Sequence, residues 1–279
     1  MEIKKTSFMD SQTVIAGLFG SADERALLAK SGAGAGGDPG WLPLGLPAQD
    51  GVPLVCKIFQ QGKEGEPDVL FFPSERDTKS DILDMAAGLG RFDMTFMAVD
   101  FRGCGESGGE LSISALPHDA EAVYNVITKW RSDGSRTGPL VIMGRSIGAA
   151  VALGLAATHQ EDTSCLILES AFDKTPNFLT GLGIPVDGLE TDPFPNRQNM
   201  RSYTKPVLFL HSSRDEAVSI TQVEWLVAES RSESTQFQIV PSPGRYGLEK
   251  ATEDFYYEAI KDFIYLRMGR RPPRKKKQA

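Results

Sequence analysis

Short, almost wholly apolar runs recur along the chain and are separated by longer stretches of mixed polarity. The runs cover residues 68–72, 94–100, 139–144, 165–169, 206–211 and 235–240. Strands that are buried on both faces of a parallel sheet have this pattern, since neither face alternates with solvent. Residues 41–59 add two apolar segments around a turn at 49–51, which predicts a strand pair at the start of the sheet.

The stretches between these runs have helical spacing of apolar residues. They cover residues 79–89, 119–131, 147–159, 220–231 and 249–266. In the second stretch Ala122, Val123, Val126 and Trp130 fall on one helix face. Strand and helix in repeated alternation predict an α/β fold with a doubly wound, mostly parallel sheet. In such sheets ligands bind at the carboxyl ends of the strands.

The chain contains no internal repeat, and its glycine distribution indicates the domain organisation. Residues 31–40 are glycine-rich and predict a flexible connector, so residues 1–40 form an N-terminal extension with one amphipathic helix near 22–30. One domain is predicted over residues 41–266, and residues 267–279 form a basic tail.

The distribution of charge along the chain restricts the classes of partner that the protein can bind. The net charge is −7, but the tail holds seven of the 30 basic residues, which leaves 23 basic and 37 acidic residues in the body. A body with a net charge of −14 repels phosphate groups, so we predict no nucleic-acid binding. The basic tail is either a solvated end or a segment that contacts an anionic surface.

Cysteine content and hydropathy bear on the compartment. Cys56, Cys104 and Cys165 are too few, and too far apart, for a disulfide framework or a zinc site. This favours a reducing compartment, and we predict a cytoplasmic protein. We find no secretory signal and no apolar run of about 18 residues, so no membrane span is expected. No cofactor and no metal ion are predicted.

The strongest local signal is the sequence Gly144-Arg145-Ser146-Ile147-Gly148, which joins a predicted buried strand to an Ala/Leu-rich helix. This is the G-x-S-x-G nucleophile-elbow pattern in the context it requires. Such a turn strains the serine backbone, and side chains at the glycine positions would collide with neighbouring elements. The N–H of Ile147, at the helix start, is expected to face a developing oxyanion. The alternative is a glycine pair that only permits close helix–sheet packing.

Three stretches together resemble the α/β-hydrolase superfamily, especially its serine-aminopeptidase-like and lysophospholipase-like branch. They are AVDFRGCGESGGE (98–110), MGRSIGAA (143–150) and KPVLFLHSSRDEAVS (205–219). The resemblance implies a serine hydrolase acting on a small ester, thioester or amide. It implies that Ser146 is the nucleophile and Asp215 the triad acid, and that His211 packs near the acid without serving as the base. Asp100 and Arg102 match a structural hub of the family.

The chain departs from this family at the triad base. Its three histidines are His118, His159 and His211, and none lies in the loop after the last strand, where the family has its catalytic histidine. Arg245 aligns with that position, and Tyr246 follows it. Arginine cannot accept a proton from serine, and tyrosine, with a pKa near 10, would need a large downward shift. We expect Arg245 to pair with Asp215.

The oxyanion loop departs as well. The family often has His-Gly after the first parallel strand, whereas this chain reads Phe72-Pro73-Ser74-Glu75. Pro73 has no N–H group to donate. The N–H of Ser74 remains a candidate for the second oxyanion donor, although the carboxylate of Glu75 would disfavour an oxyanion.

Substitute groups remain open at this point. His118 precedes a predicted helix that starts on the same sheet edge as Ser146, and is either a replacement base or a surface residue. His159 is expected at a helix end. Glu169 is either an alternative acid or a polar residue at the rim. Residues 174–204, where the family has its cap, allow a small lid but no large helical one.

Two functions therefore compete. The first is an active serine hydrolase for a small acyl substrate, supported by Ser146, Asp215 and the order of the motifs. The second is a catalytically impaired relative that keeps the pocket to bind a ligand or protein partner. Loss of the base supports the second, because removing the histidine of a serine triad can cost a factor of about 10⁶ in rate.

Overall fold

An eight-stranded sheet forms the centre of the computed structural model, which describes residues 7–21, 24, 40–59 and 62–271. The strands are β1 (Leu42–Pro47), β2 (Pro53–Phe59), β3 (Asp68–Phe72), β4 (Thr95–Asp100), β5 (Leu140–Arg145), β6 (Cys165–Glu169), β7 (Val207–Ser212) and β8 (Thr235–Val240). Their order is β1-β2-β4-β3-β5-β6-β7-β8, with antiparallel pairing of β1 with β2 and of β2 with β4, and parallel pairing elsewhere. The predicted doubly wound, mostly parallel sheet is confirmed.

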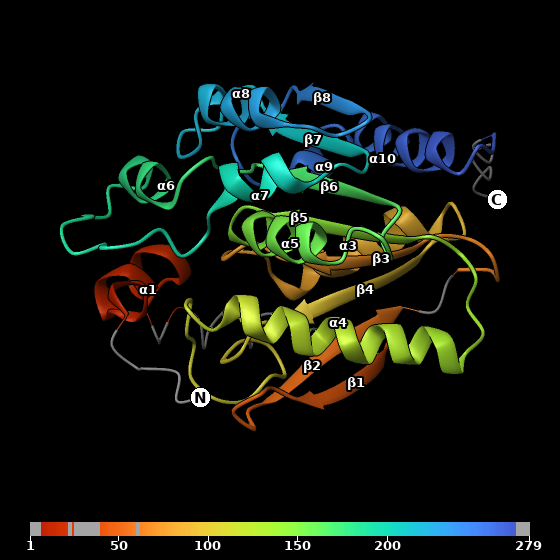
Figure 1. Ribbon diagram of the computed structural model, residues 1–279, viewed down its shortest axis with the longest axis horizontal. Helices are drawn as coiled ribbons and strands as arrows, with labels where there is room; N and C mark the ends of the chain where they lie inside the picture. Colours follow the sequence, from red (N-terminus) through yellow and green to blue (C-terminus); the bar gives the residue numbers. More distant parts are fainter. Residues whose placement is uncertain (1–6, 22–23, 25–39, 60–61, 272–279) are drawn as a thin grey trace.

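Helices cover both faces of the sheet (Figure 1). They are η1 (Phe8–Asp10), α1 (Gln12–Phe19), α3 (Lys79–Gly90), α4 (Leu116–Asp133), α5 (Ile147–Thr158), α6 (Thr175–Gly181), α7 (Asn196–Ser202), α8 (Ile220–Glu229), α9 (Leu248–Ala251) and α10 (Glu253–Arg267). Helices α4, α5, α7 and α8 pack on one face, and α3, α9 and α10 pack on the other.

Two helix predictions need comment. The helical stretch predicted over 249–266 is present but divided in two, because Thr252 adopts φ −143° and ψ 46° and separates α9 from α10. The helix predicted near 22–30 lies outside the described residues except for position 24. Helix α1 was not predicted from the sequence. Its N-terminus is capped by the Ser11 side chain, which accepts the backbone N–H of Val14.

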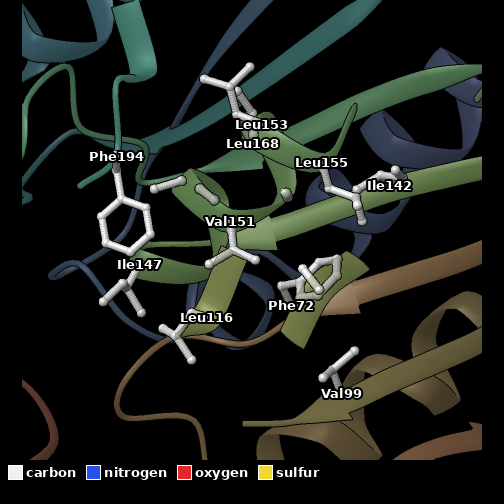
Figure 2. Packing of buried hydrophobic residues seen from close by; sticks show 14 of the residues in the cluster. Phe72, Val99, Leu116, Ile142, Ile147, Val151, Leu153, Leu155, Leu168 and Phe194 are labelled. Carbon is white, nitrogen blue, oxygen red and sulfur yellow. The ribbon is translucent and has the colours of Figure 1, made fainter. Parts of the chain in front are cut away.

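The hydrophobic core is divided by the sheet into two clusters, as a doubly wound sheet requires. Figure 2 shows part of the larger one, where Ile147 and Val151 of α5 share the cluster with Phe72 at the end of β3 and Phe194 from the segment before α7. Helix α5 is nearly enclosed because its small and apolar side chains face neighbours on most sides. The serine turn therefore begins a helix held in the core.

The N-terminal segment packs at the carboxyl edge of the sheet, where α1 lies near α6 (Figure 1). Asp10 Oδ1 accepts the backbone N–H of Ser114 at 3.1 Å. Gly17 approaches Ile184 so closely that a Cβ at Gly17 would lie 2.6 Å from Ile184 Cδ1. Among the helices of the described residues, none is long and apolar enough to cross a membrane.

Candidate active site

The turn that carries Ser146 is strained and tightly packed. Ser146 has φ 57° and ψ −119°, a conformation rare for a residue with a side chain. A Cβ at Gly144 would lie 2.2 Å from the carbonyl oxygen of Gly148, and one at Gly148 would lie 2.2 Å from that of Phe72. Both glycines are therefore required by the approach of β3, β5 and α5. The backbone N–H of Ser146 donates to Glu169 O at 2.9 Å, which fixes the turn against β6.

The Ser146 hydroxyl lies between a carboxylate and a guanidinium group. Its Oγ donates to Glu75 Oε2 at 2.5 Å and accepts from Arg245 Nη2. Arg245 Nη2 also lies 3.1 Å from Glu75 Oε1, and the Tyr246 hydroxyl donates to that same oxygen at 2.7 Å. Ser146 is 0% exposed, so its hydroxyl meets these neighbours out of contact with solvent.

Arg245 therefore lies against the serine, as its alignment with the triad base predicted, but its ion-pair partner differs from the expected one. The guanidinium pairs with Glu75 rather than with Asp215. It also stacks over Phe178 of α6, with its Cζ atom 4.7 Å from the ring centre. The prediction failed because the β3–α3 loop brings the carboxylate of Glu75 nearer to the guanidinium of Arg245 than that of Asp215, and such a contact between distant loops follows from tertiary packing.

Burial alone would raise the pKa of Glu75, but the charge of Arg245 and the hydrogen bonds from Ser146 and Tyr246 outweigh it, so the pKa lies below its ordinary value. Glu75 is consequently an anion at neutral pH. Burial and the neighbouring Glu75 carboxylate raise the pKa of Tyr246, which makes its hydroxyl a donor and not a proton acceptor.

None of the three histidines, all within the described residues, is hydrogen-bonded to Ser146. His118 is exposed at the start of α4, and His159 pairs with Glu121 at 2.7 Å at the end of α5. His211 is the penultimate residue of β7 and is fully buried, and neither ring nitrogen has a hydrogen-bond partner among the described residues. Burial lowers the pKa of His211, so its ring is neutral at pH 7.

Asp215, at the position of the triad acid, closes the turn before α8. Its Oδ1 accepts the backbone N–H groups of Ala217 at 3.0 Å and Val218 at 2.8 Å. Its Oδ2 is buried and has no hydrogen-bond partner in the described part of the chain. The carboxylate is present at the expected place, and no imidazole or guanidinium hydrogen bond engages it.

The two predicted oxyanion donors differ in their surroundings. Ile147 is the first residue of α5, and the partial positive charge of the helix N-terminus favours a negative group beside it. The backbone N–H of Ser74 donates to Asp77 Oδ2 at 2.7 Å within its own loop. That donor is therefore already engaged, and the assignment of both residues to an oxyanion site stays a prediction.

Comparison with known proteins agrees with this geometry. Residues 69–183 match the family model described as serine aminopeptidase, S33. An uncharacterized protein of Mycobacterium tuberculosis is 29% identical over 225 residues, covering 77% of this chain and 76% of that protein. Protein bem46 of Schizosaccharomyces pombe is 28% identical over 227 residues, covering 78% and 75%. The esterase Pf2001 of Pyrococcus furiosus superposes with a TM-score of 0.66 at 15% identity, over 80% of this chain and 91% of that one.

The chain belongs to the α/β-hydrolase superfamily. The serine turn lies at the carboxyl end of β5, which is the edge of the sheet where α/β folds bind ligands.

A second charged cluster, which the sequence did not predict, lies directly behind the serine turn of this hydrolase fold. Arg145 is 1% exposed and lies 2.7 Å from Asp77, 2.8 Å from Glu169 and 2.9 Å from Glu249. Tyr256 of α10 donates to Glu169 at 2.5 Å. One signal was available in the sequence, namely a charged residue inside an otherwise apolar strand–turn–helix run.

Glu169 is therefore neither a rim residue nor an acid for Ser146, because it is fully buried and bound to Arg145. Burial raises its pKa to about 7, more than Arg145 lowers it. Arg102 and Asp100 likewise act within the scaffold. Arg102 donates to Asp119 at 2.6 Å and Asp50 at 2.8 Å, and Asp100 pairs with Lys57.

A groove of about 270 Å³ lies between α4, α5 and the segment before α7. His118, Val151 and Phe194 line it, and Ser146 does not. The groove therefore follows the outer side of α5 and belongs to a different part of the molecule from the serine.

Proposed function

We propose that this α/β-hydrolase-fold protein binds a ligand at the site formed around Ser146 without turning it over by a serine triad. The observation that carries this proposal is the enclosure of Ser146 Oγ by the Glu75 carboxylate and the Arg245 guanidinium. Arg245 stays protonated and donates to the hydroxyl, which engages a lone pair that an attacking nucleophile needs.

The only proton acceptor bonded to Ser146 in the described residues is Glu75, and it is a weak base. A general base works best when its pKa lies near the operating pH. The pKa of Glu75 is held below its ordinary value, far from neutrality. The altered base and the engaged N–H of Ser74 thus both oppose acyl transfer.

A slow serine hydrolase acting on small esters, thioesters or amides is the second candidate, favoured by the 2.5 Å contact between Ser146 Oγ and Glu75 Oε2. In that reaction Oγ would attack the acyl carbon while its proton passes to Glu75. Glu75 would then protonate the leaving group, and water would hydrolyse the acyl-serine.

A fluorophosphonate probe separates the two candidates. We expect no labelling of the wild-type protein between pH 5 and pH 9 and no difference from Ser146→Ala, with Ser132→Ala as an exposed-serine control. Labelling of the wild type that disappears in Ser146→Ala and in Glu75→Gln would establish the slow hydrolase instead.

Restoring the base provides the positive control. We expect the double variant Glu75→Ala, Arg245→His to gain labelling at Ser146, because it frees the hydroxyl and adds an imidazole on the same loop. Arg231→His, at an exposed position, should leave the protein unlabelled.

We further propose a cytoplasmic location, supported by the sparse cysteines, and contact of the basic tail with an anionic surface. Residues 272–279 of that tail lie outside the described part of the chain. Cell fractionation of the full chain and of a chain ending at residue 266 tests both.

A further inference from the structure

Two hydroxyl donors and one guanidinium group converge on one carboxylate beside Ser146. The Ser146 hydroxyl donates to Glu75 Oε2 at 2.5 Å and the Tyr246 hydroxyl donates to Oε1 at 2.7 Å, while Arg245 Nη2 forms an ion pair with Oε1 at 3.1 Å. Charge-assisted hydrogen bonds of this kind are the stronger ones in proteins. The arrangement is a complete cradle for a carboxylate group.

The donors that form the cradle and the Glu75 carboxylate that lies in it come from different loops. Ser146 lies on the turn between β5 and α5, and Arg245 and Tyr246 lie on the loop after β8. Glu75 is delivered by the loop between β3 and α3, which Asp77 anchors separately through Ser74 and Arg145. The Glu75 side chain can therefore leave the cradle without removing any of its three donors.

Arg245 retains capacity for a further acceptor. Its Nε and Nη1 atoms are buried, and within the described residues neither has a hydrogen-bond partner. A buried donor without an acceptor is unfavourable, so a ligand oxygen that reaches Nε or Nη1 would be stabilised at this place. Phe178 lies against the guanidinium and stacks on Phe172 with ring centres 4.4 Å apart, which adds an apolar wall.

We propose that the cradle formed by Ser146, Arg245 and Tyr246 is a binding site for the carboxylate of a small organic acid, and that Glu75 is its internal occupant in the free protein. The inference rests on the proposed function, because it uses Ser146 as a hydrogen-bond donor and not as a nucleophile. An incoming acid competes with Glu75, whose tether gives it a high effective concentration, so removal of Glu75 exposes the site.

The test compares acids with their neutral isosteres on the Glu75→Ala protein. Acetate and benzoate are titrated against acetamide and benzamide at constant ionic strength, by calorimetry and thermal shift. We expect the acids to bind at least about tenfold more tightly than the amides, because a charged acceptor strengthens each hydrogen bond. The wild type and the exposed-site control Glu224→Ala should bind acetate at least about tenfold more weakly than Glu75→Ala.

The double variant Glu75→Ala, Arg245→Gln should lose the preference for acids. Equal binding of acid and amide by Glu75→Ala, or undiminished acid binding by the double variant, would overturn the proposal. If Glu75→Ala does not fold, Glu75→Gln keeps the occupant's shape without its charge, and the same two outcomes apply to it.

Labelling the same samples with the fluorophosphonate keeps the two proposals separate. Selective acid binding by Glu75→Ala together with labelling of the wild type at Ser146 means that the proposed function fails and the cradle stands. An unlabelled protein without acid selectivity means that the cradle fails and the proposed function stands.

Discussion

Two buried arginines flank the serine turn, and their surroundings differ in kind. Arg145 meets three carboxylates, and Glu249 Oε1 within that cluster has no hydrogen-bond partner among the described residues. Arg245 meets one carboxylate and one hydroxyl and keeps two buried donors unused. The cluster around Arg145 has more carboxylate acceptors than the arginine can pair, and it joins five structural segments. The cluster around Arg245 has more hydrogen-bond donors than acceptors, and it can therefore accept a ligand.

The largest expected effect comes from removing the first arginine. Arg145→Met leaves three carboxylates buried without a counterion and should cost about 3–5 kcal/mol of unfolding free energy. Arg245→Met leaves one such carboxylate, Glu75, on a loop that can move, and should cost about 1–3 kcal/mol. Urea denaturation measures both, with Arg231→Met as the exposed control. Equal costs at the two positions would remove the distinction between them.

The next effect concerns pH. The pKa of Glu169 is raised to about 7 from 4.5, so the folded state holds an extra proton between these values. Its contribution to stability is greatest below about pH 4.5 and is lost as pH rises through 7. One pKa unit corresponds to about 1.4 kcal/mol, which makes the loss on the order of 3–4 kcal/mol. Glu169→Gln should flatten the stability curve between pH 5 and pH 8, and an unchanged slope would contradict this.

The contribution of Glu75 to stability should depend on pH in the opposite direction. Its pKa is lowered by Arg245 and its hydrogen bonds despite burial, so it stabilises the fold above its ordinary pKa and loses that contribution as pH falls through the folded-state value. Glu75→Gln should cost about 1–2 kcal/mol at pH 7 and less at pH 4. Denaturation at both pH values measures the difference, and a cost that grows in acid would refute the assignment.

The smallest expected effect is at Tyr256. Tyr256→Phe removes the hydrogen bond to Glu169 and should cost about 1 kcal/mol at pH 8, where Glu169 is ionised. Because that bond lowers the pKa of Glu169, its loss should move the pH transition upward. Tyr246→Phe, in the other cluster, should leave the transition in place.

The sheet could be predicted because parallel strands are buried on both faces and leave short apolar runs in the sequence. Runs such as 68–72 and 165–169 coincide with β3 and β6. The serine turn could also be predicted, since Gly144 and Gly148 are required by backbone contacts within one continuous segment.

The side-chain contacts within the site were harder to predict from the sequence. Glu75 reaches Ser146 from a loop 71 positions earlier, and no local periodicity encodes such a contact. The Arg145 cluster likewise depends on Glu249, which is 104 positions away. Side-chain partners across loops follow from tertiary packing, so the sequence pointed to Arg245 near Ser146 but not to its pairing with Glu75.

The left-handed backbone of Ser146 has an evolutionary consequence. Its geometry is imposed by neighbouring main-chain atoms and by α5 in the core, so natural selection can exchange the surrounding side chains while the turn persists. A lineage could lose acyl transfer and regain it by a few codon changes without rebuilding the scaffold. Genome surveys that count Gly-x-Ser-x-Gly signatures therefore count inherited architecture, and each enzyme among them needs its own assay.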